Sequence, residues 1–361
     1  MGTRVKTSGA WFRSISVLLC CCGVGWSAAA SEKVTVRVMT RNMDAGTDLK
    51  LVLAATDDKS FAQGVAATLA EIHASGVSQR AARIAEEIAL QKPDLIGLQE
   101  VTLYRTGPFS LQPTGAADVL YDQLDLLMSE LAHRNLKYAI AVAQNLLDVE
   151  VPVPTQNLNL RMTDRDVILV RSDLQQSGLD VFNIQTRRFQ TLLPLPVLGG
   201  LVILRSAESA DVNMGGQVFR FVSTHLEGPI PGIPQTVLVQ LAQAQEILDA
   251  LKTTDAPVVL IGDFNANAES GADHTGAVEL LVNGGFQDVW HALHPDNPGY
   301  TWPLFPEDQA RAYPISYQER IDLIFARGLT PVSIQRLSVG GFWGAMASDH
   351  AGVVATLEIG N

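Results

Sequence analysis

Short apolar runs alternate along the chain with longer stretches in which apolar residues recur at helical spacing. In segment 78–91, Ala81, Ile84, Ala85 and Ile88 would share one face of a helix, while charged residues occupy the other. The helical pattern predicts helices over Ser78–Gln91, Asp118–Arg134 and Gln235–Lys252. The apolar runs predict strands over Val34–Thr40, Leu95–Gln99, Asp166–Val170, Gly200–Leu204, Gln217–Thr224, Val258–Gly262, Ile321–Ala326 and Val353–Leu357.

This alternation predicts an α/β layered fold with a site at the strand ends, because polar residues directly follow several strands. Hydrophobic residues make up 47% of the chain and charged residues 18%, which is enough to bury a sizeable core. We expect loops where Gly and Pro cluster, at 106–115, 194–200, 228–234 and 294–306. None of them resembles a linker, so residues 34–360 are expected to form one domain.

The first 30 residues have the composition of a cleaved signal peptide. Positive charge comes first, from Arg4, Lys6 and Arg13. An uncharged stretch follows, and it ends in Ala28-Ala29-Ala30, the small-residue pattern that signal peptidase accepts. The apolar part of this stretch is shorter than the ~20 residues that a membrane anchor needs. All three cysteines, Cys20 to Cys22, lie in this segment, and Leu19 before them disfavours lipid attachment. We expect cleavage near Ser31 and a secreted or periplasmic protein.

The charge balance is strongly acidic. The net charge is −12, and removal of the first 30 residues, which carry three basic and no acidic residues, makes it −15. A protein of this sign lacks the cationic field that draws polyanions to a surface. Its charge therefore disfavours tight, processive binding of DNA and leaves local or metal-bridged contacts.

Several predicted strands end in residues that a hard cation and a phosphate require. Glu100 follows an apolar strand, where a buried carboxylate needs a metal or a cation; an exposed acid is the alternative. Asp263 and Asn265 lie two positions apart after a second apolar strand, so both can point to one side if the chain stays extended. The alternative is that they only form a turn. Asp263 suits proton exchange, and the Asn265 amide suits a phosphate oxygen. His225 ends a third strand.

Asp349 and His350 precede the final strand as an acid and an imidazole on neighbouring positions. Neighbours in an extended chain face opposite sides, so one can hold a metal while the other faces the phosphorus. His350, with an ordinary pKa of about 6.5, suits proton removal from water. Asp322, at the start of another apolar strand, can orient it. A solvated acid beside a core histidine is the alternative.

Six short pieces of the chain contain these residues. In order, they are Arg41-Asn42-Met43-Asp44, Leu98-Gln99-Glu100, Ser223-Thr224-His225, Gly262-Asp263-Phe264-Asn265, Arg320-Ile321-Asp322 and Ser348-Asp349-His350. The ordered set resembles the endonuclease/exonuclease/phosphatase superfamily, which includes pancreatic-type DNases, abasic-site endonucleases, neutral sphingomyelinases and inositol-polyphosphate phosphatases. The middle of the chain matches less well, and no role is assigned to Asp164, Arg165 and Asp166.

The resemblance implies a four-layered α/β sandwich of two mixed β-sheets flanked by helices. It also implies Mg²⁺, with Mn²⁺ or Ca²⁺ as alternatives, held mainly by Glu100 and near Asn42, Asp44 and Asp349. Further implied roles are phosphate contact by His225 and Asn265, action of Asp263 on the nucleophile or leaving group, and orientation of His350 by Asp322. The implied reaction is in-line attack of water on a phosphodiester, without a covalent intermediate.

Other readings stay open. One is an inactive phosphate- or lipid-binding module of the same fold. Another is contact with a membrane lipid surface or a nucleic-acid base through loop aromatics, although such side chains more often pack inward. These aromatics are Trp290, Tyr300, Trp302, Phe305, Phe342 and Trp343. The substrate, nucleic acid or phospholipid headgroup, is left undecided, and we expect a monomer without an obligate protein partner.

Overall fold

Among the described residues, the strands pair into two β-sheets, and both lie within the unit formed by residues 33–361. The computed structural model describes residues 1–2, 33–194, 202–230, 232–270, 274–302, 318–337 and 346–360. The predicted signal peptide, together with Phe305, Phe342 and Trp343, therefore lies outside the described residues, apart from Met1 and Gly2.

Both sheets are mixed, because each contains one parallel pair among antiparallel ones. In spatial order the first contains β13 (Leu329–Arg336), β14 (Val353–Ile359), β1 (Thr35–Asn42), β2 (Leu95–Gln99), β6 (Leu158–Arg171), β3 (Leu103–Pro108) and β4 (Asp118–Asp122), with β5 (Tyr138–Val153) also paired to β6. The second contains β11 (Gln287–Asp288), β12 (Asp322–Arg327), β10 (Val258–Asp263), β9 (Gln217–His225), β8 (Ser206–Met214) and β7 (Leu179–Arg188).

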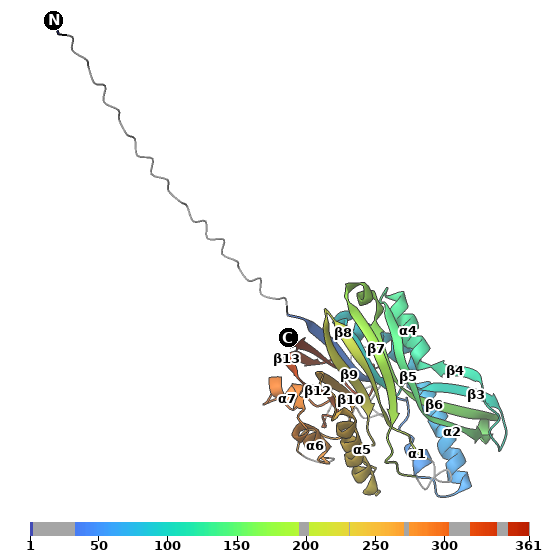
Figure 1. Ribbon diagram of the computed structural model, residues 1–361. Coiled ribbons are helices and arrows are strands. Elements are labelled where there is room, and N and C mark those ends of the chain that lie inside the picture. The colour runs from blue at the N-terminus through green and yellow to red at the C-terminus, as the bar shows by residue number, and fades with distance from the viewer. Residues whose placement is uncertain are drawn as a thin grey trace. The chain divides into compact units, whose positions relative to one another are not determined.

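Helices cover the outer face of each sheet (Figure 1). The helices are α1 (Lys50–Leu53), α2 (Asp58–Ala74), α3 (Val77–Gln91), α4 (Gln123–His133), α5 (Gln235–Leu251), α6 (Ala277–Asn283) and α7 (Val289–Leu293), with short 3₁₀ turns η1 (Pro154–Gln156) and η2 (Ser172–Ser177). Helices α3 and α4 pack on the first sheet, and α5 and α6 pack on the second. The order is helix, sheet, sheet, helix, so the predicted four-layered sandwich is confirmed.

The core follows from alternation along the strands. In β10, Val259 and Ile261 point between the sheets, whereas Val258 and Leu260 point toward α5 and α6. Both faces of this strand are therefore buried, which is why its sequence is a continuous apolar run. Trp290 also belongs to the core between the sheets, so this aromatic side chain packs inward.

Several boundaries differ from the sequence prediction. The predicted helix 118–134 is wrong in its first turn, because Asp118–Asp122 is strand β4. The Val-Leu-Tyr sequence at the centre of this segment favours a strand. Helix α4 begins only after Asp122, whose side chain caps it by accepting hydrogen bonds from two backbone N–H groups. The strand predicted over 200–204 is not found in its described part, where Val202 makes only an isolated bridge. The predicted loop 106–115 begins inside β3.

One carboxylate fixes the loop before β4. Glu150, on β5, accepts hydrogen bonds from the backbone N–H groups of Thr114, Gly115 and Ala116 and from the Asn159 amide. Burial opposes its ionisation, but these bonds outweigh it and lower the pKa of Glu150 to about 2. Among the described residues, no helix is long and apolar enough to span a membrane.

Candidate active site

The predicted site residues come from both sheets and meet where the parallel strand pairs end. Asn42 ends β1 and Glu100 follows β2, while His225 and Asp263 are paired ends of β9 and β10. Asp322 begins the antiparallel strand β12 opposite Asp263. His350 precedes β14, which is antiparallel to β1, so its position is at the same end. Crevices at the carboxyl ends of strands are common ligand sites in α/β folds.

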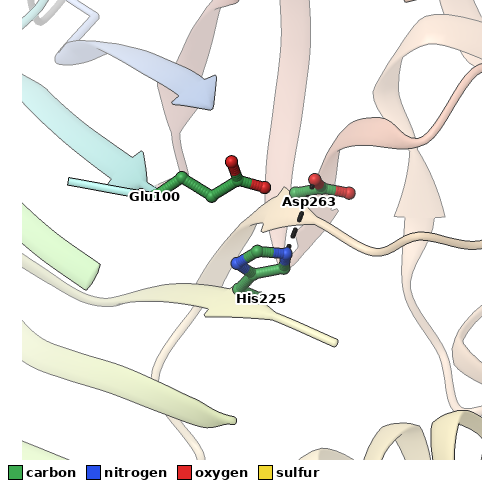
Figure 2. A group of neighbouring side chains, drawn as sticks. All are labelled: Glu100, His225 and Asp263. Atoms are coloured by element: carbon green, nitrogen blue, oxygen red, sulfur yellow. Dashed lines mark ion pairs between the residues drawn. The ribbon is translucent and has the colours of Figure 1, made fainter. Parts of the chain in front are cut away.

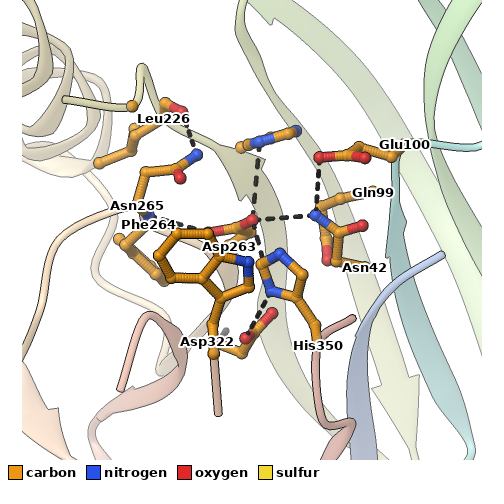
Figure 3. A network of polar contacts seen from close by, with 12 residues as sticks. Asn42, Gln99, Glu100, Leu226, Asp263, Phe264, Asn265, Asp322 and His350 are labelled. Atoms are coloured by element: carbon orange, nitrogen blue, oxygen red, sulfur yellow. Dashed lines mark hydrogen bonds and ion pairs between the residues drawn. The ribbon is translucent and has the colours of Figure 1, made fainter. Parts of the chain in front are cut away.

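Asn42 joins the two sheets through a central hydrogen-bond network (Figure 3). Its amide nitrogen donates to Glu100 Oε1 and to Asp263 Oδ2, each at 3.0 Å. The other Glu100 oxygen accepts from the backbone N–H of Ala45 at 2.8 Å. Burial opposes ionisation of Glu100, but His225, His350 and these hydrogen bonds lower its pKa overall. Glu100 is therefore an ionised carboxylate held in a fixed direction.

The backbone is strained at three predicted site residues. Asp44, Glu100 and Asn265 have φ values of 61°, 56° and 48°, in the left-handed region that non-glycine residues seldom adopt. Strain of this kind persists where the surrounding structure imposes it, and it clusters at functional sites. Gly262 has a φ of 152°, and a Cβ there would lie 2.0 Å from the carbonyl oxygen of Thr224. Only glycine lets β10 approach β9 so closely just before Asp263.

His350 and Asp322 form a buried pair. Asp322 Oδ2 lies 2.9 Å from His350 Nδ1, and the backbone N–H of Asp322 donates to Thr301 Oγ1. Burial opposes protonation of His350, but Asp322, Asp349 and Asp263 raise its pKa well above the ordinary value. Because Nδ1 is engaged by Asp322, Nε2 is the ring nitrogen left for water or substrate. The pair thus has the geometry of a base and its orienting carboxylate.

His225 lies between Asp263 and Arg205. Its Nε2 is 3.7 Å from Asp263 Oδ2, as drawn in Figure 2, and one Arg205 nitrogen lies 2.9 and 3.0 Å from its two ring nitrogens. Burial and the Arg205 charge lower the pKa of His225. A neutral imidazole is therefore favoured at neutral pH.

The buried carboxyl groups of Asp164 and Asp166 lie close to Arg205, and Glu208 lies close to Asp166. Asp166 and Glu208 are both fully buried, and Asp166 Oδ1 lies 3.8 Å from His225 Nδ1. Burial raises the pKa of Asp166 to about 8 and that of Glu208 well above its ordinary value. Burial and the charge of Asp166 raise the pKa of Asp164 to about 7. Protonation of some of these groups at neutral pH relieves their repulsion.

Three predicted residues have other partners in this structure. Asp44 forms an ion pair with Arg80 at 2.8 Å. Asp349 Oδ2 accepts from the Trp302 indole at 3.4 Å, and burial, with the Asp44 charge, raises the Asp349 pKa to about 7. The Asn265 amide donates to the carbonyl of Leu226 at 3.0 Å. Their assigned roles stay predictions, as do those of the six residues that meet in the centre.

Comparison with known proteins agrees with this arrangement. The model of the Endonuclease/Exonuclease/phosphatase family matches residues 71–350, which is most of the chain. The chain belongs to this family. Tyrosyl-DNA phosphodiesterase 2 of Rattus norvegicus is 26% identical over 184 residues, or 47% of this chain and 45% of that protein. The chain thus matches less than half the length of this curated relative.

Solved structures of the family share the fold. An endonuclease/exonuclease/phosphatase from Bacteroides vulgatus aligns over 91% of this chain and 100% of its own, with a TM-score of 0.56 and 18% identity. The TDP2 of D. rerio, complexed with a single-strand DNA product, aligns over 90% of this chain and 99% of its own, with a TM-score of 0.51 and 19% identity. Membership of this family supports a hydrolase acting on phosphodiester bonds.

Three features of this site are not predicted from the sequence, namely Arg205, Glu208 and the contact of Trp302 with Asp349. Arg205 has one signal in retrospect, since no charged residue occurs from Phe189 to Leu204 immediately before it. Asp166 was noted but given no role. Glu208 alternates with partly buried positions in β8 like any inward residue, and only its burial in the structure sets it apart.

Proposed function

We propose that this protein is a secreted, metal-dependent phosphodiesterase that hydrolyses its substrate by in-line attack of water. The observation that supports it most is the network in Figure 3, in which His350, paired with Asp322, lies beside the Asn42, Glu100 and Asp263 cluster. The proposed base, the carboxylate that orients it and the acidic cluster thus lie together at one end of the two sheets. The family to which the chain belongs acts on phosphate esters.

The donor chemistry of this cluster fits a hard cation. Ligand atoms of Glu100, His225 and Asp263 all lie within 4.8 Å of one another, and so do those of Asp263, Asp322 and His350. Carboxylate oxygens are the ligands that Mg²⁺ prefers. Glu100 would be its main ligand, with Asn42 and Asp349 close by. Such an ion stabilises negative charge on phosphate oxygens.

The side chains of the site have separate roles in proton transfer and phosphate binding. In its neutral form, which its raised pKa shifts to higher pH, His350 accepts a proton from water at Nε2, and Asp322 holds the ring at Nδ1. His225, neutral and backed by Arg205, donates to a phosphate oxygen. Asp263, whose pKa is raised by burial, acts on the nucleophile or leaving group. No covalent intermediate is required.

Nucleic acid and phospholipid headgroups are both candidate substrates. The name of the rat relative indicates a phosphodiester that joins tyrosine to DNA, which favours the former. The net charge of −12 disfavours long duplexes, because an acidic surface repels a polyanion.

We propose that the first 30 residues direct export; protein recovered outside the cell with Met1 still attached would contradict this.

The decisive assay is a panel of substrates with and without Mg²⁺. It contains plasmid DNA, RNA, sphingomyelin, phosphoinositides and bis(p-nitrophenyl) phosphate. We expect hydrolysis of at least one diester that is lost in Glu100→Gln. Tight binding of a diester without turnover would support the inactive binding module instead.

A further inference from the structure

We propose that Arg41, aligned by Glu87 on α3, is a positioning residue that fixes His350 for catalysis by holding its main-chain carbonyl. This inference rests on the proposed function, which assigns to His350 the role of the base. Arg41 belongs to the first of the six motif pieces, but its sequence position suggests no role in the site. It is fully buried and comes immediately before Asn42 at the end of β1.

All three nitrogen atoms of the Arg41 guanidinium are engaged. Nη1 donates to the main-chain carbonyl of His350. Nε lies 3.0 Å from Oε2 of Glu87, and Nη2 donates to Oε1 of the same carboxylate at 3.3 Å. A two-point contact of this kind fixes the plane of a guanidinium, and with it the direction of the third nitrogen. Glu87 therefore aims Nη1 at His350.

This contact lies just beyond the point where backbone pairing ends. The antiparallel ladder between β1 and β14 runs up to the pair of Thr40 with Val353. His350 precedes this ladder in the chain, and Arg41 follows it on β1 while still paired with β2. The Arg41 side chain thus gives the carbonyl of His350 the donor that a neighbouring strand gives within a ladder.

The stem of Arg41 also packs against the loop that contains His350. A Cβ added to Gly352 would lie 3.3 Å from Cδ of Arg41, so the loop lies directly on the arginine. Asp322 holds the imidazole at Nδ1, and Arg41 holds the main chain of the same residue. Because the two contacts act on different parts of His350, both are needed to fix the direction of Nε2.

The effect of Arg41 on the site is geometric. Its charge is neutralised at close range by Glu87, and it donates to the carbonyl of His350 and not to the imidazole. A buried ion pair is also a weak source of stability, because the loss of hydration offsets the attraction. Replacement of both partners by apolar residues of similar size is often neutral for stability. We therefore expect the protein to fold without the pair, which separates positioning from folding.

The test replaces both partners in Arg41→Met/Glu87→Met, the double-Met variant, and measures hydrolysis of bis(p-nitrophenyl) phosphate at saturating metal. We expect kcat to fall on the order of 10-fold or more while KM stays within about 2-fold, because a displaced base slows the reaction without a change in substrate contacts. Arg41→Lys, which keeps a donor for the carbonyl, should recover part of kcat. The control Arg220→Met/Asp211→Met removes a 2.7 Å ion pair at the end of β9 away from His225 and should keep kcat.

The same change in a His350→Ala background shows whether Arg41 acts through the base. There the double-Met substitution should alter kcat by less than about 2-fold, because no imidazole is left to position. An equal loss of kcat with and without His350 would overturn the positioning role and leave the phosphodiesterase standing. Unchanged kcat of the double-Met variant in the natural background would overturn it as well.

A second measurement requires no turnover. In a carbon–proton NMR spectrum of histidine-labelled protein, the Cε1–H signal of His350 is the one that disappears in His350→Ala. In the double-Met variant this signal should shift or broaden, because the ring leaves its fixed position, whereas in the Arg220→Met/Asp211→Met control it should not. An unchanged signal would overturn the positioning of His350 by Arg41. A shifted signal in a protein that hydrolyses no diester would support the positioning contact and reject the proposed function.

Discussion

The pairing of Asp322 with His350 makes a quantitative prediction about catalysis. The 2.9 Å contact is buried, and Asp322 is only 1% exposed, so no water can replace the carboxylate when it is changed to an amide. His350→Ala removes the proposed base, and Asp322→Asn removes the negative charge that holds its ring at Nδ1. We expect each change to lower kcat on the order of 10²-fold or more, the usual scale of general-base catalysis.

The double variant distinguishes a shared role from two independent ones. If the residues act as a unit, its kcat should lie close to that of the worse single variant. Independent roles would multiply to roughly 10⁴-fold, so the coupling amounts to about 2.7 kcal/mol at 1.36 kcal/mol per tenfold change. The assay is steady-state hydrolysis of bis(p-nitrophenyl) phosphate at saturating metal. Multiplicative losses would refute the paired role.

Asp94→Asn is a matched control for this pair. Asp94 is also a buried carboxylate, and it accepts from the backbone N–H of Arg37 at 2.8 Å, but it precedes β2 and so lies at the end of the sheet away from Glu100. We expect this variant to lose thermal stability while the folded protein keeps its kcat. A comparable loss of kcat would mean that buried carboxylates act through stability alone.

Three further changes test the fold and the site. Glu150→Gln should lower the free energy of unfolding by about 1 kcal/mol at pH 7, after allowance for solvent screening. Because the pKa of Glu150 is lowered to about 2 in the folded protein, the difference in stability between the variant and the natural sequence should vanish as the pH falls from about 4.5 to 2. Acid-unfolding curves of the two proteins measure it. Gly262→Ala should cost about 2 to 4 kcal/mol in chemical unfolding, against about 1 for Gly216→Ala, which has a positive φ but open space; equal costs would contradict the close approach. Arg205→Ala should reduce kcat/KM on the order of 10-fold or more, with partial recovery in Arg205→Lys, because the charge beside His225 is lost; unchanged kcat/KM would remove Arg205 from the site.

The sequence predicted the layered fold because its strongest signals are periodic and local. The run 258–262 is apolar on both faces and could only be a central strand, and the helix 78–91 begins and ends within one residue of its predicted limits. Elements held mainly by tertiary contacts were missed. Helix α2 has a weak apolar face, and the long strand β5 mixes polar and apolar positions while it packs on α2 and pairs with β6.

The candidate site was predictable for a different reason. Residues at strand ends are marked by an abrupt change from apolar to polar, which places Glu100, Asp263 and His225 without any structure. Arg205 follows no such strand, and its contact with His225 depends on the pairing of β8 with β9. The direction of a side chain also cannot be predicted from the sequence, so the ion pair of Asp44 with Arg80 was not predicted.

The central claim is that a metal held at Glu100 is required for phosphodiester hydrolysis. The most direct measurement is the rate of bis(p-nitrophenyl) phosphate hydrolysis by the purified protein in excess EDTA, followed by titration with Mg²⁺. We predict no turnover in EDTA and full recovery with Mg²⁺, while Glu100→Gln shows a steep loss and an altered response to the metal. Full activity of the natural sequence in excess EDTA would contradict the account.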